Sequence, residues 1–339
     1  MNRLIRSPLA LVGILIAPGL APGQPAGEPA TAPRTAWGAP DLQGVWDFRT
    51  VTPLQRPADL AGRTTLTAEE AAEVEQRAAA QRVDSAPQQG DPGTYNQFWF
   101  DFGTSVVPTR QTSLIVDPPD GRLPALTETG RARQAAHGAA GGRPVRLRVG
   151  GIGTDGPEDR GLAERCLLGF NAGPPMVPSG YNNNMQFFQT PDHVVILTEM
   201  VHDARLVPLD DRPGLPSDVR QWRGVSRGYW EGDTLVVESD NFTDKTGSFD
   251  PSVVQAVGSG ETLHLTERFT RIDTDTLLYE FTVNDGTTYS RPFTASIPMR
   301  RGEGPLFEYA CHEGNYGLRN VLAGARIEER AAGTESGAR

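Results

Sequence analysis

The chain has 339 residues, of which 37% are hydrophobic, and a formal net charge of −10. That length and apolar content suffice for one large domain with a real core, or for two small ones. The acidic balance argues against nucleic acid as a partner, because phosphate backbones are bound by surplus Lys and Arg.

The first residues follow the plan of a cleavable secretory signal peptide over residues 1–23. Arg3 and Arg6 precede an apolar stretch from Leu9 to Leu20, and small residues follow. That stretch is too short to span a bilayer, so we expect no stable membrane insertion after cleavage; an N-terminal anchor is the alternative. Cleavage removes the two arginines and no acid, which changes the charge from −10 to −12. The sequence predicts a periplasmic or secreted protein.

The mature chain is expected to form a leader, one domain and a tail. Residues 24–36 are rich in Pro, Ala and Gly, which favours a flexible leader. Residues 37–329 are expected to fold as a single β-rich domain with helical insertions, and residues 330–339 to form a disordered tail.

Two helical insertions are predicted in the first half of the domain. Thr67 followed by Glu70 fits a capping box at the start of an Ala- and Glu-rich helix over about residues 66–82. A second short helix, over about residues 127–137, is expected to end at Gly138, where glycine supplies a left-handed stop.

The second half alternates short runs of β-branched and aromatic residues with turn residues, which is typical of an antiparallel meander. The absence of βαβ alternation disfavours a parallel nucleotide-binding sheet. The predicted strands are Met185–Gln189, His193–Val201, Ser226–Trp230, Thr234–Ser239, Thr262–Ile272, Thr276–Val283, Ser290–Met299 and Leu306–Cys311. We therefore predict a mainly β fold that forms a closed or nearly closed barrel, with an open sandwich as the alternative.

Three short motifs carry resemblances. Gly44-Val45-Trp46, at the start of an expected strand, resembles the G-x-W motif that opens lipocalin-like barrels, although the long insertions between residues 52 and 180 depart from a simple lipocalin. The segments WEGDTLVVE (230–238) and CHEGNYGL (311–318) are similar to those of a group of exported bacterial proteins. That second resemblance implies an extracytoplasmic location and no particular activity.

Cys166 and Cys311 are the only cysteines. In an oxidising compartment two cysteines favour one disulfide bridge. Two buried free thiols and a reactive pair are the alternatives, although no C-x-x-C redox motif is present.

Such a bridge would bring two polar segments together. Arg160 and Glu164 precede the first cysteine, and the planar guanidinium of arginine suits a carboxylate or a substrate anion. His312 and Glu313 follow the second cysteine, and a rigidly held imidazole is the usual group for proton transfer near neutral pH. The alternative is that the first segment is a solvated loop and that the histidine is merely packed and hydrogen-bonded.

A third polar group ends the apolar strand predicted over 193–201. Period-two alternation places Glu199 and Asp203 on the face of Leu197, and His202 on the other face. If the Leu197 face is the core side, both carboxylates point inward, where lost solvation raises their pKa and suits them to acid–base chemistry. The alternative is an edge at which the charges meet water.

Asn183, Asn184 and Tyr309 offer amides and an aromatic face, which suit a polar organic molecule. For the asparagines the alternative is a turn with left-handed residues. The sequence lacks H-E-x-x-H, calcium-loop, nucleophile-elbow and Walker spacings, so we expect no metal and no cofactor.

The sequence thus predicts an exported enzyme that performs acid–base chemistry on a small organic molecule, as a hydrolase, lyase or isomerase. His312 would shuttle protons, assisted by Glu313, His202, Asp203 or Glu199. The alternative is a non-catalytic, lipocalin-like protein that binds a small-molecule ligand. A structure in which His312 lies within hydrogen-bond reach of a carboxylate in a concave pocket would favour the enzyme. A deep, dry barrel with these residues outside it would favour the binding protein.

Overall fold

The structure of the protein is a computed structural model, which describes residues 32–83, 97, 100–140, 162–163, 165–210, 212–243 and 260–337. Residues from Thr31 onward belong to one compact unit. The predicted signal peptide and the first part of the predicted leader lie outside the described residues.

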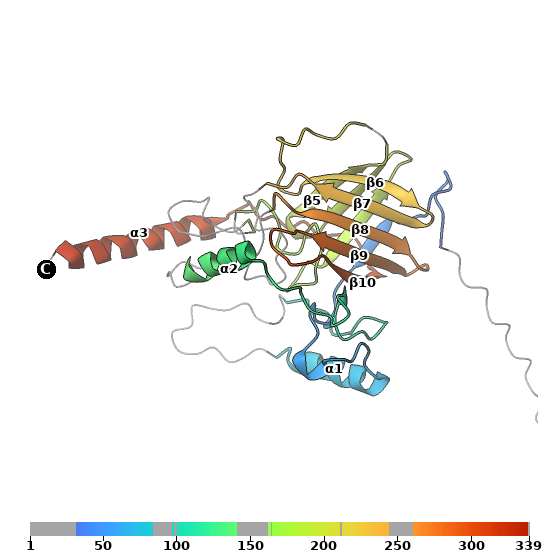
Figure 1. Ribbon diagram of the computed structural model, residues 1–339, viewed down its shortest axis with the longest axis horizontal. Coiled ribbons are helices and arrows are strands. Elements are labelled where there is room, and N and C mark those ends of the chain that lie inside the picture. The colour runs from blue at the N-terminus through green and yellow to red at the C-terminus, as the bar shows by residue number, and fades with distance from the viewer. Residues whose placement is uncertain are drawn as a thin grey trace, which may run out of the picture. The chain divides into compact units, whose positions relative to one another are not determined.

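An antiparallel sheet rolls into a nearly closed barrel (Figure 1). Neighbouring strands follow one another in chain order, and the last strand returns to pair with the first, while the short β2 pairs with β10. The predicted mainly β meander is therefore confirmed. The strands are β1 (Gly44–Asp47), β2 (Ile115–Asp117), β3 (Asn184–Gln189), β4 (His193–Thr198), β5 (Asp203–Pro208), β6 (Val225–Glu231), β7 (Thr234–Asp240), β8 (His264–Arg271), β9 (Thr276–Asn284) and β10 (Phe293–Arg301).

The seam of the barrel lies between β5 and β6, the two ends of the strand order. Every pair of hydrogen-bonded neighbours from β5 through β1 to β6 is antiparallel, which makes β5 and β6 run in the same direction. Parallel neighbours need a crossover connection, which residues 209–224 supply. Gly228 of β6 lets β5 approach, because a Cβ there would lie 2.9 Å from Val207 Cγ1. Side-chain packing therefore closes the seam.

Aromatic side chains fill the barrel, and Trp46 of β1, which ends the G-x-W motif, is fully buried. Phe269 stacks on Tyr279 with ring centroids 4.9 Å apart and meets the edge of Phe187 at 5.0 Å. The Trp46 Nε1 donates to the Leu42 carbonyl at 2.8 Å, which satisfies the polar end of the indole. The barrel centre thus holds a core of tightly packed aromatic side chains.

Helix α1 (Ala68–Ala80) begins as predicted. Thr67 Oγ1 accepts from the Glu70 N–H at 3.2 Å, and a Glu70 carboxylate oxygen accepts from the Thr67 N–H at 2.9 Å. This reciprocal pair is the capping box, so the start read from the sequence is confirmed.

The other helices differ from prediction. Helix α2 (Glu128–Ala140) passes Gly138, where a stop was expected. A glycine within a helix costs only about 1 kcal/mol relative to alanine, and two alanines follow this one. Helix α3 (Tyr316–Gly337) was not predicted and includes residues 330–337 of the expected tail.

Two strand predictions also need correction. The segment Leu306–Cys311 forms no strand, and the strand predicted to run to Val201 ends at Thr198. Beyond Thr198 the chain turns through the short 3-10 helix η4 (Met200–His202) into β5. The core side of β4 is the face of Val194 and Ile196 rather than that of Leu197.

Candidate functional site

The predicted disulfide is present. Cys166 and Cys311 are joined by an S–S bond of 2.08 Å, with their Cα atoms 5.6 Å apart. The bond ties the segment after β10 to the segment before β3, across 145 residues of sequence.

Aromatic rings gather beside this bond. Tyr309 stacks on Tyr181 with ring centroids 6.4 Å apart, and Phe170 meets the edge of Tyr181 at 5.3 Å. The His202 Nδ1 lies 2.9 Å from the Tyr309 carbonyl oxygen. We call Phe170, Tyr181, His202, Tyr309 and the bridge the disulfide corner. Two of the predicted site residues, His202 and Tyr309, therefore meet there.

The turn that carries His202 has an unusual backbone. Val201 and His202 both adopt left-handed conformations, with φ of 63° and 41°. Such a conformation is rare for a residue with a Cβ and especially for a β-branched one. Val201 is buried against the aromatic cluster, which holds the turn in place.

Glu199 and Asp203 flank this turn. Glu199 is 6% exposed; its carboxylate accepts from Asn184 Nδ2 at 2.7 Å and from the Phe307 N–H at 3.5 Å. Asp203 pairs through Oδ1 with Arg223, while its Oδ2 is buried without a hydrogen-bond partner. Burial lowers the pKa of Arg223 to about 10, so it remains a cation at neutral pH.

Of the predicted residues near the second cysteine, Glu313 lines a hollow of about 340 Å³ together with Tyr309 and Cys311, and His312 is not among the described residues that line it. His312 and Glu313 are exposed, and within the described chain the His312 ring has no hydrogen bond or ion pair. Arg160 and Glu164 lie outside the described residues. The contact expected between their segment and His312 therefore stays a prediction.

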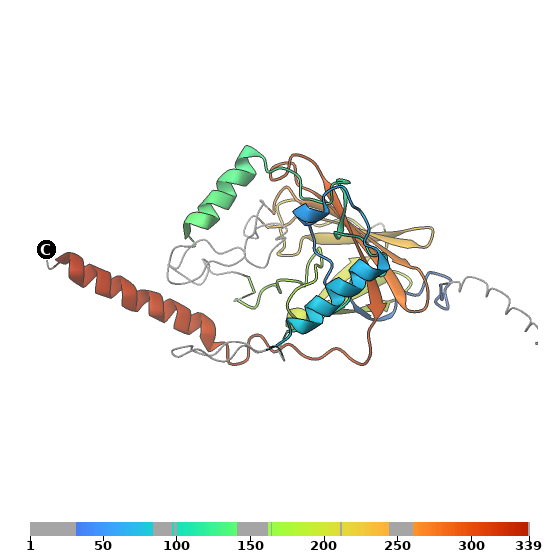
Figure 2. The same ribbon diagram turned by 90° about the horizontal axis from the view of Figure 1, so that it is seen from below.

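A second candidate site lies between α1 and the chain that follows β1. There α1, the blue helix in front of the barrel in Figure 2, borders an open cavity of about 700 Å³. Small-molecule sites are commonly clefts of about 300–1,000 Å³. The lining combines apolar and polar groups: Thr50, Val51, Thr52, Pro53, Leu54, Val74, Arg77, Ala78, Gln81, Arg82, Gln97, Phe102, Gly103, Leu114, Val177 and Pro178.

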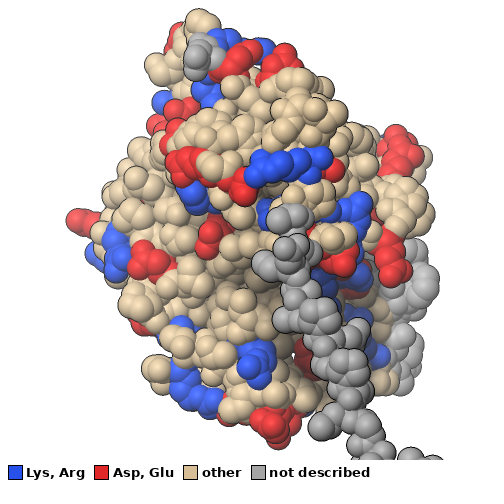
Figure 3. All heavy atoms as spheres, turned by 90° about the vertical axis from the view of Figure 1, so that its right-hand side faces the viewer, with Lys and Arg blue, Asp and Glu red and all other residues tan. Residues whose placement is uncertain are grey.

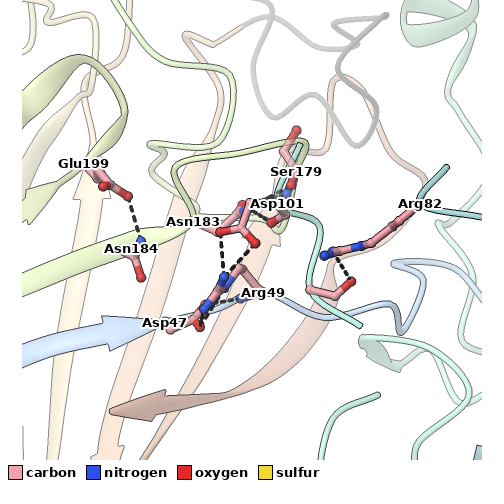
Figure 4. A network of polar contacts seen from close by, with 9 residues as sticks. Asp47, Arg49, Arg82, Asp101, Ser179, Asn183, Asn184 and Glu199 are labelled. Carbon is pink, nitrogen blue, oxygen red and sulfur yellow. Dashed lines mark hydrogen bonds and ion pairs between the residues drawn. The ribbon is translucent and has the colours of Figure 1, made fainter. Parts of the chain in front are cut away.

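A polar network fixes one wall of this cavity (Figure 4). Arg49 Nη1 donates to both oxygens of Asp101 at 2.6 Å, and Arg49 Nε donates to Asp47 at 2.7 Å. These contacts raise the pKa of Arg49 further above its ordinary value, with the hydrogen bond to Asp47 as the largest cause. The wall residues Phe102 and Gly103 follow Asp101 directly, so this network positions them.

Asn183 connects the same wall to the start of β3. It is fully buried; its Nδ2 donates to the Asp101 and Ser179 carbonyls at 3.0 and 2.8 Å, and its Oδ1 accepts from the Ser179 N–H at 2.8 Å. The predicted left-handed turn falls on Asn182, with φ of 53°. Asn183 is therefore a structural clamp beside the cavity, while Asn184 binds Glu199.

The barrel interior holds a polar cluster that the sequence analysis missed. The guanidinium of Arg205 on β5 binds both carboxylate oxygens of Glu267 on β8, and the Tyr279 hydroxyl donates to Glu267 Oε1 at 2.8 Å. Glu267 and Tyr279 are fully buried, and desolvation raises the pKa of Tyr279 well above its ordinary value. Period-two alternation does place Glu267 on the side of Leu265 and Phe269, which was the available signal.

Within the described part of the chain, no three metal-ligating side chains gather into a group, and no helix is long and apolar enough to cross a membrane. Comparison with protein families, with curated proteins and with solved structures gave no match to this chain.

Proposed function

We propose that this protein binds a small organic molecule in the cavity between α1 and the chain after β1. The observation that carries the proposal is the cavity itself, about 700 Å³ in volume and lined by both apolar and polar groups. A pocket of that size with a few convergent polar groups is the usual form of a small-molecule site. Buried aromatic and aliphatic side chains pack the barrel core, and Leu114 of that core also borders this cavity.

The walls are held in place without a ligand. Helix α1 is anchored by a small apolar cluster in which Leu66, Ala71 and Val106 are buried, with Val74 packed against it. The Val106 N–H also donates to Glu75 Oε1 at 3.0 Å. Preformed walls reduce the ordering cost of binding, which favours a site that selects its ligand by shape.

A tryptophan that projects into the cavity should weaken binding. The probe is N-phenyl-1-naphthylamine, a neutral aromatic molecule whose fluorescence rises in apolar surroundings. We expect Ala78→Trp to weaken probe binding at least tenfold, because residue 78 lines the cavity. Ala79→Trp is the matched control, because Ala79 is the next residue on α1, is exposed and does not line the cavity. Equal affinities in the two variants would contradict the proposed site.

We place this function in an oxidising compartment outside the cytoplasm, in the periplasm or as a secreted protein. The support is the bridge between Cys166 and Cys311, since structural disulfides persist chiefly in such compartments. The signal peptide expected over residues 1–23 agrees with this placement.

Acid–base catalysis at the turn between β4 and β5 is a second candidate. It is favoured by the left-handed turn at Val201 and His202, flanked by the buried Glu199 and by Asp203 with one unpartnered oxygen. Strained backbone of this kind often accompanies functional sites. His312 is less favoured, because its ring has no hydrogen-bond partner in the described chain, whereas the equally exposed His202 is held by the Tyr309 carbonyl.

The enzyme proposal predicts a specific loss. His202→Gln should lower turnover of a responsive substrate, found in a panel of small organic metabolites, by about a hundredfold, as expected for a lost proton-transfer group. His264→Gln is the control, since His264 is an exposed histidine at the start of β8. Turnover that is unchanged in His202→Gln, or absent from the parent across the panel, would count against catalysis.

A further inference from the structure

The charge of the cavity lining indicates what kind of molecule it holds. Resting on the proposed binding function, we propose that the ligand is an organic anion with an apolar body, whose acidic group is bound by Arg77 and Arg82. Both arginines line the cavity, and no Asp or Glu is among the described residues that line it. The apolar body would contact side chains such as Val51, Leu54 and Val177.

Neither arginine is neutralised by a carboxylate within the described chain. Arg82 Nη2 donates to the Gly103 carbonyl at 2.7 Å, and Arg77 Nε donates to the Glu73 carbonyl at 3.3 Å. A guanidinium carries five N–H donors, so each keeps donors for a ligand. Many other arginines are paired with acids, and Figure 3 shows basic and acidic side chains interspersed on one face. Examples of such pairs are Arg49–Asp101, Arg63–Glu70, Arg212–Asp210, Arg268–Glu231 and Arg291–Asp117.

The charged side chains on the lining itself favour an anion, whereas the acidic groups nearby make other contacts. Asp101, next to the cavity wall, is already paired with Arg49, and Glu75 of α1 accepts a backbone N–H from Val106. The C-terminal end of α1 adds a partial negative charge of about −0.5. The two guanidinium groups of the lining outweigh that partial charge, but Asp47, Asp101 and Glu75 nearby carry more charge than Arg49 offsets. Recognition of the anion therefore depends on direct contact with Arg77 and Arg82.

Arg82 is placed more firmly than a surface arginine. It is half-buried, and its bond to Gly103 runs from the end of α1 to the opposite wall (Figure 4). Gly103 has a φ of +75°, and a Cβ there would lie 3.0 Å from Arg49 Cβ, so glycine lets this wall pack against Arg49. A guanidinium held in one orientation suits the planar geometry of a carboxylate or sulfonate.

Two related probes test this inference. 1-Anilinonaphthalene-8-sulfonate carries the same ring system as N-phenyl-1-naphthylamine together with one sulfonate, so the ratio of their affinities reports recognition of the anion. We expect the parent to prefer the sulfonate, and Arg77→Met and Arg82→Met each to lower the affinity ratio about tenfold, the usual scale for a lost hydrogen bond to a charged group. Added salt should lower the ratio in the parent as well.

Arg131→Met is the matched control. Arg131 of α2 also donates to a single carbonyl, that of Leu126 at 2.7 Å, but it does not line the cavity. Arg131→Met removes one positive charge, as each cavity variant does. A ratio that falls equally in this variant, or that stays constant in both cavity variants while circular dichroism shows them folded, overturns the anion inference. A parent that binds neither probe instead overturns the proposed binding function, which keeps the two failures apart.

Discussion

Arg205→Met is expected to lower the free energy of unfolding by about 3–5 kcal/mol, the scale for an ion left alone inside a protein. Glu267 is fully buried and has both carboxylate oxygens on this guanidinium. The Tyr279 hydroxyl donates to one of these oxygens, and one neutral hydrogen bond does not replace the lost charge. Urea unfolding measured at neutral pH gives the change.

Two further variants define the cause of that loss. Arg291→Met removes a pair with Asp117 in which both side chains are about half exposed, and it should change stability by less than about 1 kcal/mol. The double variant Arg205→Met/Glu267→Leu removes both buried charges and should recover most of the loss, because apolar side chains can replace a buried pair. A loss below about 1 kcal/mol in Arg205→Met alone would contradict the view that Glu267 is a buried charge that depends on Arg205.

The parts of the fold that the sequence predicted are those set by local patterns. Alternation between buried and exposed residues and turns such as Glu231-Gly232-Asp233 gave the meander, because both signals lie within a few residues. The capping box at Thr67 is equally local. The strand predicted at Leu306–Cys311 was wrong because its composition is suited to a strand but no neighbouring strand pairs with it there. Pairing is decided by the rest of the chain.

The same distinction between local patterns and contacts that depend on the whole chain applies to the candidate sites. The bridge was predictable because two cysteines allow a single pairing, and it does bring Tyr309 to His202. The cavity was not predictable, since its walls come from α1, from residues 50–54 and from residues 177–178. No spacing within one segment reports such a meeting. The pairing of Arg205 with Glu267 likewise depends on how the barrel closes, because β5 and β8 are not neighbours in the sheet.

The double variant Cys166→Ala/Cys311→Ala should also be strongly destabilised. The bridge closes a loop over 145 residues of sequence, and the loss of such a constraint favours the unfolded chain by about 4–5 kcal/mol on chain-entropy grounds. The free energy of unfolding, measured with urea, should fall by that amount. Adding reductant should destabilise the parent and leave the double variant unchanged, which separates loss of the bond from the effect of the two substitutions.

The size of that loss depends on whether residues 302–315 unfold together with the barrel. Tyr309 packs on Tyr181 and binds His202 through its carbonyl, while Phe307 donates to Glu199, so several contacts beside the bridge hold this segment. If these contacts hold the segment on the barrel, the two unfold as one unit, and the free energy of unfolding of the barrel falls by the full amount. If the segment detaches first, proteolysis after Arg301 should rise sharply in the double variant while barrel unfolding shifts by less than about 1 kcal/mol. The second result would falsify a cooperative role for the bridge and limit it to holding the disulfide corner together.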